Sequence, residues 1–403
     1  MMDPFFESVY TPFFKDKKIL LGVTGSIAAV KSYDLVRTLT KLGAKVRVVL
    51  TANGARFVTP LSFETLTDEP CLTSLWDDTH GTKHIDLARW ADIAVVAPAT
   101  ANCIARLANG LADDLLSTEL LAFTGPILIA PAMNPAMWNN VATQANLKTL
   151  RAREIQFLGP DAGETACGEE GFGRMIEIQP MIEQIATYLR FPQNGKTVTV
   201  NLGPTRSAMD PVRYFTNRSS GKMGAALAFA LAHKGYAVHV IAGPTDVPLP
   251  LSSKITRVTT TAEMESASTK AFKGSDVFFA SAAVLDFEVE KPSKQKIKKL
   301  SPQEPVRFHP TPDILLKLGK MKSRNQVLVG FAAETENHVS NAQKKLSIKN
   351  CDYIFVNPVE KQGSGFDSIL NQGWLVSHKT KPKNIDLKTK AELAEAILTE
   401  LDL

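Results

Sequence analysis

The chain has 403 residues, of which 44% are apolar, and its formal net charge is +5. A single hydrophobic core stops growing near ~250–300 residues, so this length predicts two or three domains with ample core. The composition excludes a disordered chain. The small basic excess gives no indication of a nucleic-acid partner, although it favours anionic substrates.

The cysteines predict a reducing compartment. They are widely spaced and form no CxxC pair, so neither a disulfide framework nor a zinc site is expected. They are Cys71, Cys103, Cys167 and Cys351. We therefore expect reduced thiols in a cytoplasmic protein. The first 14 residues lack the basic start and continuous apolar core of a signal peptide. No run of ~18 apolar residues occurs, so no membrane span is predicted.

The first half of the chain alternates short apolar runs with segments of helical spacing. Buried strands are expected at residues 17–24, 44–51, 91–100 and 125–134. Each run is followed by a turn and then a helical pattern. This alternation predicts a mostly parallel sheet with helices on both faces.

The second half repeats this format after a linker at residues 189–196, which contains a Pro and an Asn-Gly pair. A helix is expected at residues 223–235. Strands are expected at residues 196–205, 237–243, 276–284, 326–334 and 352–357. The fold class is therefore α/β, with two doubly wound domains, Rossmann-like or flavodoxin-like, at residues 1–190 and 191–403. The polar, basic segment 290–305 has the composition of a disordered surface loop.

Candidate ligand-binding residues follow the predicted strands of the first half, because open α/β sheets bind ligands at the carboxyl ends of their strands. Gly22, Gly25 and Ser26 form a turn into a helix whose free N–H groups could hold a phosphate. The dinucleotide fingerprint GxGxxG is absent, so a mononucleotide is the better expectation.

The later strands of this half end in unusual segments. Thr51 follows the second strand, "PATAN" ends in Asn102, and "PAMNPAMW" contains Asn134. Small residues here would let a flat ring approach the backbone, which suits a flavin. Met133, Met137 and Trp138 are more often core residues than site residues.

The segment "GETACGEEGFGRM", residues 163–175, sets Cys167 among four glycines. Glycine permits backbone approaches that other residues block. One interpretation is a surface loop with a spare thiol. The other is a mobile flap that carries a reactive group over a bound substrate.

Together these motifs resemble a known family. "GSIAAVK", "PATAN", "GLADDLLS", "PAMNPAMW", "HIDLARWAD" and "ACGEEGFGRM" are similar to the flavin-dependent cysteine decarboxylases. In the second half, the similar motifs are "GPTRSAMDPVRYFTNRSSGKMG", "SAAVLDF", "KIKK", "TPDIL", "GFAAET" and "KKLSIKNCDYIFVN". The whole chain thus resembles the bifunctional phosphopantothenoylcysteine decarboxylase/phosphopantothenate–cysteine ligase family of bacterial coenzyme A synthesis.

For the first half, the resemblance implies an FMN-dependent oxidative decarboxylation followed by re-reduction to 4′-phosphopantetheine. His84 would act as base. Asn134 would hold the substrate carboxylate through a neutral amide, and Cys167 would give the final proton to an enethiolate. The expected FMN contacts are Gly25, Ser26, Thr51, Thr100, Asn102 and Met133.

For the second half, the resemblance implies that CTP activates 4′-phosphopantothenate as an acyl-cytidylate, which cysteine then attacks. Lys296 would stabilise the crowded phosphorus, and Asn217, with Arg213 one helical turn before it, would hold the acyl-cytidylate. Asp286 would also help to place Mg²⁺. The expected CTP contacts are Ala280, Ser281, Ala282, Asp286, Lys296, Pro312, Asp313, Ile314, Leu315, Phe331, Lys345 and Lys349.

The chain departs from the family pattern at a few positions. Cys103 and Asp114 stand where Thr and Asn are expected, which puts details of flavin contact in doubt. Thr311 replaces an Asn, and "GSGFDSILN" replaces the usual "FGSDxN" order.

Alternatives stay open at this point. The chain could be an FMN-binding regulatory module without turnover, or an enzyme with one active half, or a ligase that uses ATP. A Rossmann dehydrogenase is disfavoured because its fingerprint is missing. The family also implies small-molecule substrates, no nucleic acid, no membrane and a homo-oligomer.

Overall fold

The computed structural model describes residues 2–76, 83–164, 166–298, 305–358, 365 and 368–403. The chain divides into two compact units. The N-terminal unit is Tyr10–Leu189, and the C-terminal unit joins residues 1–9 to Arg190–Leu403. The expected boundary near residue 190 did not anticipate that residues 1–9, the start of α1 (Pro4–Phe14), group with the later half of the chain.

The N-terminal unit alternates strands and helices until a short hairpin and a final helix end it. Its strands are β1 (Lys18–Val23), β2 (Lys45–Leu50), β3 (Ile93–Ala99), β4 (Ile127–Pro131), β5 (Gln156–Phe157), β6 (Asp161–Glu164) and β7 (Glu170–Arg174). Its helices after α1 are η1 (Ile27–Val30), α2 (Lys31–Lys41), η2 (Gly54–Arg56), α3 (Pro60–Thr67), α4 (Lys83–Trp90), α5 (Ala101–Asn109), α6 (Leu115–Ala122), α7 (Pro135–Asn139), α8 (Val141–Ala152) and α9 (Ile178–Leu189).

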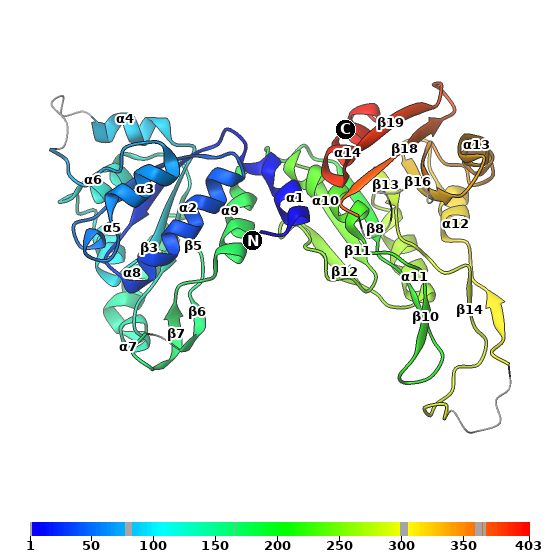
Figure 1. The fold of residues 1–403 in the computed structure, drawn as a ribbon, viewed down its shortest axis with the longest axis horizontal. Helices are drawn as coiled ribbons and strands as arrows, with labels where there is room; N and C mark the ends of the chain where they lie inside the picture. Colours follow the sequence, from blue (N-terminus) through cyan, green and yellow to red (C-terminus); the bar gives the residue numbers. More distant parts are fainter. Residues whose placement is uncertain (1, 77–82, 165, 299–304, 359–364, 366–367) are drawn as a thin grey trace. The chain divides into compact units, whose positions relative to one another are not determined.

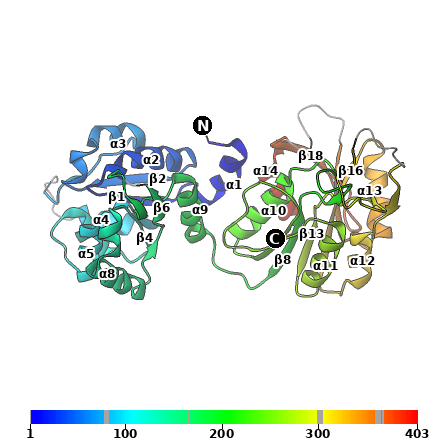
Figure 2. The same ribbon diagram turned by 90° about the horizontal axis from the view of Figure 1, so that it is seen from below.

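The sheet of this unit is parallel, in the order β2-β1-β3-β4-β5. Helices α2 and α3 lie on one side of it, and α4, α5 and α8 lie on the other (Figure 2). The strand order reverses between β1 and β3. In a doubly wound sheet this is the switch point, where the connecting loops diverge and leave a crevice at the carboxyl ends.

The C-terminal unit has more strands, and several of them form small accessory ribbons. Its strands are β8 (Thr197–Leu202), β9 (Arg206–Ala208), β10 (Tyr214–Thr216), β11 (Ala237–Ala242), β12 (Lys254–Arg257), β13 (Val277–Ala280), β14 (Phe287–Val289), β15 (Phe308–Pro310), β16 (Val327–Glu334), β17 (Tyr353–Pro358), β18 (Leu370–Ser377) and β19 (Lys383–Thr389). Its helices are α10 (Lys222–His233), α11 (Thr261–Phe272), α12 (Ile314–Met321), α13 (His338–Ile348) and α14 (Lys390–Glu400).

The main sheet of this unit has the order β12-β11-β8-β13-β16-β17-β18-β19 (Figure 1). It is parallel as far as β17, and β18 and β19 add an antiparallel edge. The order reverses between β8 and β13, which places a second switch point here. Helices α11, α12 and α13 contribute to one hydrophobic core, while α10 packs with α14.

The fold class predicted from sequence is confirmed, because both units are parallel sheets flanked by helices. All nine predicted strands of the two sheets are present, and α10 covers the predicted helix. The hairpin β6–β7, the pairs β9–β10 and β14–β15, and the edge β18–β19 were not expected. The first three pairs are short or rich in glycine, and Asn371, Gln372 and Gly373 interrupt the apolar residues of β18, so these strands lack the apolar runs that marked the others.

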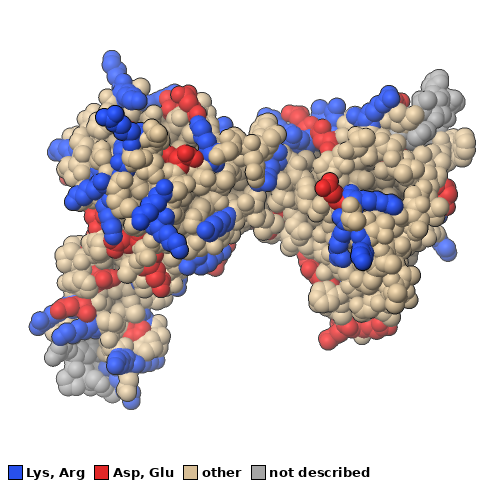
Figure 3. All heavy atoms as spheres, turned by 180° about the vertical axis from the view of Figure 1, so that it is seen from behind, with Lys and Arg blue, Asp and Glu red and all other residues tan. Residues whose placement is uncertain are grey.

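Two further observations concern the charged side chains of the surface and the length of the helices. Acidic and basic side chains are interspersed over the face drawn in Figure 3, with neither sign filling it alone. Within the described ranges, none of the helices combines the length and apolar character that crossing a bilayer requires.

One glycine controls how α12 packs in the C-terminal unit. A Cβ at Gly319 would lie 1.8 Å from the carbonyl oxygen of Lys349. The Asn350 side chain donates a hydrogen bond of 2.8 Å to the Gly319 carbonyl. The helix therefore rests directly on the backbone at the end of α13, and only glycine allows this approach.

We expect Gly319→Ala to lower the free energy of unfolding by about 1–3 kcal/mol, because the added methyl group forces α12 away from Lys349. Urea denaturation of the full chain measures this loss. Gly274→Ala is the matched control, since a Cβ there meets nothing within 4 Å. Equal midpoints for the two variants would contradict the packing argument.

Candidate functional site

The first candidate site is a cavity of ≈ 360 Å³ at the switch point of the N-terminal unit. We call it the switch-point cavity. Thr24, after β1, connects the two central strands: its hydroxyl donates to the Pro98 carbonyl at 2.7 Å and accepts from the Thr100 N–H at 3.1 Å. The lining includes Thr24, Gly25, Thr51, Asn53, Thr73, Thr100, Asn102, Cys103, Arg106, Asp114, Leu115 and Met137.

Four of the six residues predicted to bind FMN line this cavity, namely Gly25, Thr51, Thr100 and Asn102. The lining suits a flavin mononucleotide chemically. Hydroxyl and amide groups provide hydrogen-bond partners, while the Leu115 and Met137 side chains provide apolar surface for a ring. Gly25 is required here, since a Cβ on it would lie 2.5 Å from the Cβ of Asn53.

Asp114, one of the departures from the family pattern, has a clear structural role. Its side chain accepts a hydrogen bond of 2.8 Å from the Ser117 N–H and caps α6. It also pairs with Arg106, which binds Asp113 at 3.0 Å as well. The capping bond is one that Asn would also make, whereas the ion pair with Arg106 requires the acid.

The second candidate site is a cavity of ≈ 330 Å³ beside the β6–β7 hairpin, which we call the hairpin cavity. It brings together Ser26 and Met133, the other two predicted FMN contacts, with Asn134 and Cys167. These four residues come from three segments far apart in the sequence. Other residues of the lining are Lys31, Glu164, Ala166, Gly173, Arg174 and Met175.

The glycines of the hairpin permit close backbone packing. A Cβ at Gly173 would lie 2.3 Å from the carbonyl oxygen of Met133, and one at Gly171 would lie 3.0 Å from the Cβ of Pro135. The Met133 N–H donates to the Gly173 carbonyl at 2.9 Å. Strand β7 is thus held against the segment that follows β4, which brings Cys167 and Asn134 to one cavity.

The Asn134 side chain is held at both ends. Its Oδ1 accepts from the Ala136 N–H at 2.7 Å and so caps α7, which orients the amide. Its Nδ2 donates to a carboxylate oxygen of Glu169 on the hairpin, also at 2.7 Å. The group predicted to hold a substrate carboxylate therefore binds a carboxylate of the protein itself.

Cys167 differs from the other three cysteines in its exposure. Cys71, Cys103 and Cys351 are buried, and burial raises the pKa of each thiol to about 12. Cys167 is exposed and lines the hairpin cavity. It is therefore the thiol placed to exchange a proton with a ligand in the cavity.

His84, the predicted base, belongs to the first turn of α4. Its side chain lies outside the part of the structure that is described, so its predicted role stays a prediction.

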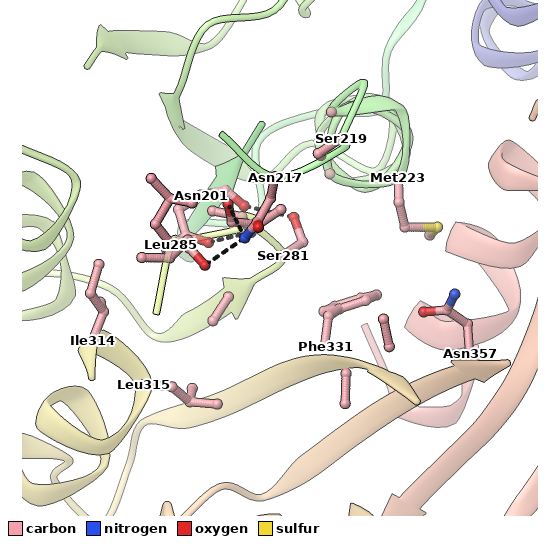
Figure 4. Close-up of a pocket in the computed structure, with 18 of the residues that line it drawn as sticks. Asn201, Asn217, Ser219, Met223, Ser281, Leu285, Ile314, Leu315, Phe331 and Asn357 are labelled. Carbon is pink, nitrogen blue, oxygen red and sulfur yellow. Dashed lines mark hydrogen bonds between the residues drawn. The ribbon is translucent and has the colours of Figure 1, made fainter. Parts of the chain in front are cut away.

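The third candidate site is a cavity of ≈ 680 Å³ at the switch point of the C-terminal unit, which we call the nucleotide cavity (Figure 4). Asn217 lines it, and so do eleven of the twelve residues predicted to contact CTP. Those eleven are Ala280, Ser281, Ala282, Asp286, Pro312, Asp313, Ile314, Leu315, Phe331, Lys345 and Lys349.

Asn217 is fixed by backbone carbonyls of the segment after β13. Its Nδ2 donates to the Val284 carbonyl at 2.9 Å and to the Ala283 carbonyl at 3.4 Å (Figure 4). Its Oδ1 is not used in these bonds. Buried Asn201 of β8 accepts from the Ala282 N–H at 3.0 Å and holds the same segment. The cavity wall is therefore built by amide side chains that replace missing ladder hydrogen bonds.

The two predicted lysines of this cavity stand at the C-terminal end of α13, Lys345 in its last turn and Lys349 as its C-cap. Lys345 forms an ion pair of 2.6 Å with Glu334. Lys349 pairs with Asp313, the residue that caps α12. Burial lowers the pKa of Lys349. A partly buried ammonium group in such a wall favours an anionic ligand.

Sequence reasoning missed the N-terminus of α10 as part of this cavity. Ser219, Ser220 and Gly221 lead into the helix and line the cavity with Lys222 and Gly224. A Cβ on Gly224 would lie 2.4 Å from both the Leu202 Cβ and the Ser281 Oγ, so glycine sets the helix close to β8. Free N–H groups at a helix start bind phosphates. The glycines of "SSGKMG" after a strand were the available signal.

Lys296 and Arg213 are not among the residues that line the nucleotide cavity. Arg213 pairs with buried Asp210 and donates to the Ile297 carbonyl at 2.8 Å, which ties the segment of Lys296 to the β9–β10 turn. The expectation that Arg213 precedes Asn217 by one helical turn is wrong. The intervening residues form β10, because Asp210 accepts from the Val212 and Arg213 N–H groups and closes a turn.

Metal ligands do not gather in the described residues, where no group of three or more His, Cys, Asp and Glu side chains could hold an ion. Asp286 lines the nucleotide cavity and is exposed. A metal bound there would need ligands from a bound substrate, as Mg²⁺ commonly has in nucleotide sites.

Comparisons with known proteins cover both units. Residues 11–190 match the family described as Flavoprotein, and residues 193–402 match the family described as DNA/pantothenate metabolism flavoprotein C-terminal domain. The coenzyme A biosynthesis bifunctional protein CoaBC of Haemophilus influenzae is 41% identical over 392 residues, which is 96% of this chain and 97% of the relative. That of Escherichia coli K12 is 39% identical over 395 residues, 96% of each chain.

A crystal structure of the C-terminal domain of CoaBC is 33% identical to this chain. It covers 52% of this chain and 95% of its own, with a TM-score of 0.45.

We expect a thiol reagent such as iodoacetamide at pH 8 to modify Cys167 at least ~100-fold faster than the buried cysteines, because the thiolate is the reacting form. Peptide mass spectrometry of the native chain locates the modification. Cys167→Ser should remove the fast phase, whereas Cys103→Ser should keep it. A fast reaction at Cys103 would contradict the assigned environments.

Proposed function

The chain belongs to the family of coenzyme A biosynthesis bifunctional proteins, and we propose that it catalyses two consecutive steps of coenzyme A biosynthesis. The first is the CTP-dependent ligation of cysteine to 4′-phosphopantothenate. The second is the FMN-dependent decarboxylation of the product to 4′-phosphopantetheine. Residues 1–190 form the decarboxylase domain, and residues 191–403 form the ligase domain.

Two observations together support this proposal: the relatives match both halves of the chain, and each half has a cavity lined by predicted site residues. The curated relatives match along 96% of the chain, through both halves. Each unit also has a cavity at its own strand switch point, and these cavities and the hairpin cavity are lined by most of the residues predicted for the two reactions, though not by Lys296 or Arg213. A regulatory module without turnover has no need for Asn134, Cys167 and Asn217 to be retained together.

In the decarboxylase domain, FMN, when bound, accepts and returns a hydride, so the overall reaction consumes no oxidant. Gly25, Thr51, Thr100 and Asn102 hold the cofactor. Asn134 binds the substrate carboxylate by exchanging it for Glu169. A neutral amide recognises the acid without the strong ion pair that would oppose loss of CO2. Ser26 and Met133, which line the hairpin cavity, would contact the cofactor from that side.

Two further groups in this domain move protons. His84 takes a proton from the substrate during its oxidation, since a neutral imidazole is a suitable base near pH 7. Cys167 gives the last proton to the enethiolate. The lining of one cavity by both this thiol and Asn134 supports that role.

In the ligase domain, the triphosphate of CTP lies between the N-terminus of α10 and the lysines of α13. Asn217 presents its Oδ1 to the cysteine amine that attacks the acyl-cytidylate. Lys296 stabilises the pentacoordinate phosphorus, and Asp286 would help to hold Mg²⁺, which would supply positive charge to the triphosphate. The enzyme acts as a homo-oligomer on small-molecule substrates.

The first test is mass spectrometry of one reaction mixture. Purified protein is incubated with 4′-phosphopantothenate, cysteine and Mg²⁺, with CTP in one tube and ATP in another. We expect 4′-phosphopantetheine and CMP to form in the tube with CTP, and no product to form in the tube with ATP. Accumulation of phosphopantothenoylcysteine would show that the ligase is active and the decarboxylase is not. An unchanged mixture in both tubes would overturn the proposal.

We expect Cys167→Ser to release CO2 from phosphopantothenoylcysteine but to accumulate the enethiol, because a serine hydroxyl is too weak an acid to donate the last proton. The measurement is the ratio of CO2 to 4′-phosphopantetheine, which should be near one for the parent enzyme and rise by at least ~100-fold in the variant. Normal turnover would show that Cys167 is not the acid.

We expect Asn217→Asp to form CMP-activated acid but to block the amide, because a carboxylate cannot keep both backbone contacts and the neutral oxygen that faces the amine. Trapping of acyl-cytidylate by mass spectrometry tests this. Normal amide formation at an unchanged rate would remove Asn217 from the second half-reaction.

A further inference from the structure

The hairpin cavity contains two cationic side chains that the proposed chemistry does not use. Lys31 is the first residue of α2, and Arg174 is the last residue of β7. Both line the same cavity as Asn134 and Cys167. They lie far apart in the sequence, so it is the fold that brings them to one cavity.

A single carboxylate holds the two cations side by side. Oε1 of Glu177 accepts from Nζ of Lys31 at 2.9 Å and from a guanidinium nitrogen of Arg174. Both bonds reach one oxygen atom, so the two cationic nitrogens lie within reach of a single tetrahedral anion. The hydrogen bond from Lys31, followed by its charge and by Arg174, lowers the pKa of Glu177 and keeps it ionised.

The three groups carry one net positive charge at the base of the hairpin. Arg174 pairs in register with Asp161 at this end, and Glu164 pairs with Glu170 toward the tip that carries Cys167. Glu164 is the remaining charged residue of the cavity lining. Lys31 and Arg174 therefore stand at the base with the acids Asp161 and Glu177, whereas Glu164 and Glu170 stand toward the tip with the thiol.

Arg174 extends across the hairpin over a glycine. A Cβ placed on Gly163 would lie 3.4 Å from Nη1 of Arg174 and 3.6 Å from its Cδ. The guanidinium group is about half exposed and the Lys31 side chain about a third. Both keep donors beyond those bound by Glu177, since an ammonium group has three N–H bonds and a guanidinium group has five.

We propose that Lys31 and Arg174 form the subsite for the terminal phosphate monoester of the decarboxylase substrate, and so select the phosphorylated substrate. The inference rests on the proposed function, because that substrate carries a phosphate at one end and the reacting cysteine at the other. Cations at the base of the hairpin anchor the phosphate, and Asn134 and Cys167 act on the other end.

The phosphate of FMN is the other possible source of the same chemistry. Four of the six predicted FMN contacts line the switch-point cavity, whereas the other two, Ser26 and Met133, line the hairpin cavity with Lys31 and Arg174. Asn134 and Cys167 share the hairpin cavity with the two cations, which favours the substrate phosphate, and the experiment below distinguishes the two sources.

The test compares two substrates on the full-length, FMN-loaded enzyme. Steady-state decarboxylation is measured with 4′-phosphopantothenoylcysteine and with unphosphorylated pantothenoylcysteine. We expect kcat/KM for the phosphorylated substrate to fall by about 10-fold in each of Lys31→Ala and Arg174→Ala, because each removes a charge-assisted hydrogen bond. The value for the unphosphorylated substrate should change by less than about twofold.

The control is the double variant Arg37→Ala/Lys148→Ala, which removes two exposed positive charges of the same unit outside the cavity lining. It should keep the parent preference for the phosphorylated substrate. Arg174→Lys should recover most of the preference that Arg174→Ala loses, which a merely structural role of Arg174 would not predict.

Three results would overturn the inference. An equal loss on both substrates would mean that the cations serve the fold or the carboxylate. If the alanine variants bound less FMN than the parent but kept the same affinity for riboflavin, Lys31 and Arg174 would be assigned to the phosphate of the cofactor. An unchanged preference in both alanine variants would place the substrate phosphate elsewhere. If the parent enzyme decarboxylates neither substrate, the proposed function fails and this inference falls with it.

Discussion

Parallel pairing of β1 with both β2 and β3, and of β8 with both β11 and β13, is the constraint on which both sites depend. It brings the carboxyl ends of all these strands to one edge and forces the following loops apart at the switch point. Side-chain hydrogen bonds connect the neighbouring strands at these points. Thr24 bonds to Pro98 and Thr100 at the end of β3, and Asn201 bonds to Ala282 after β13. Each cavity is thus a consequence of strand order, and the residues around it are free to specialise.

Close backbone contact, made possible by glycine, connects these sheets to the elements that complete the sites. Gly173 lets β7 rest on Met133, Gly224 lets α10 rest on β8, and Gly319 lets α12 rest on Lys349. In each case a methyl group would fall within 2.4 Å of a neighbouring atom. Gly171 and Gly173 of the hairpin therefore act in this structure as contact surfaces, whereas a Cβ on Gly168, beside Cys167, would meet nothing within 4 Å.

Local pattern was sufficient for nine strands of the two sheets, because apolar runs mark buried strands. Most residues of the cavity linings were predicted from the family resemblance, and local pattern did not reveal β5, β12 or the edge β18–β19. It was insufficient wherever geometry depends on polar side chains. The turn closed by Asp210 converts the residues before Asn217 into a strand, and no periodicity signals that turn. The bond from Asn134 to Glu169 is likewise tertiary, since the two residues are 35 positions apart. The start of α10 was overlooked because its glycines follow a short accessory strand and not a strand of the main sheet.

The distribution of charge in the hairpin cavity follows from what each anion must do. A carboxylate that will leave as CO2 has to lose its charge, so a strong ion pair would stabilise the state that must react, and a neutral amide such as that of Asn134 avoids this cost. A phosphate that stays intact gains from direct cationic contact, and its binding energy can hold the reacting end in place. Lys31 and Arg174, kept together by Glu177, would provide such contact in the proposed reaction. A neutral donor for one anion and cationic donors for the other would allow tight binding without slowing the step that follows.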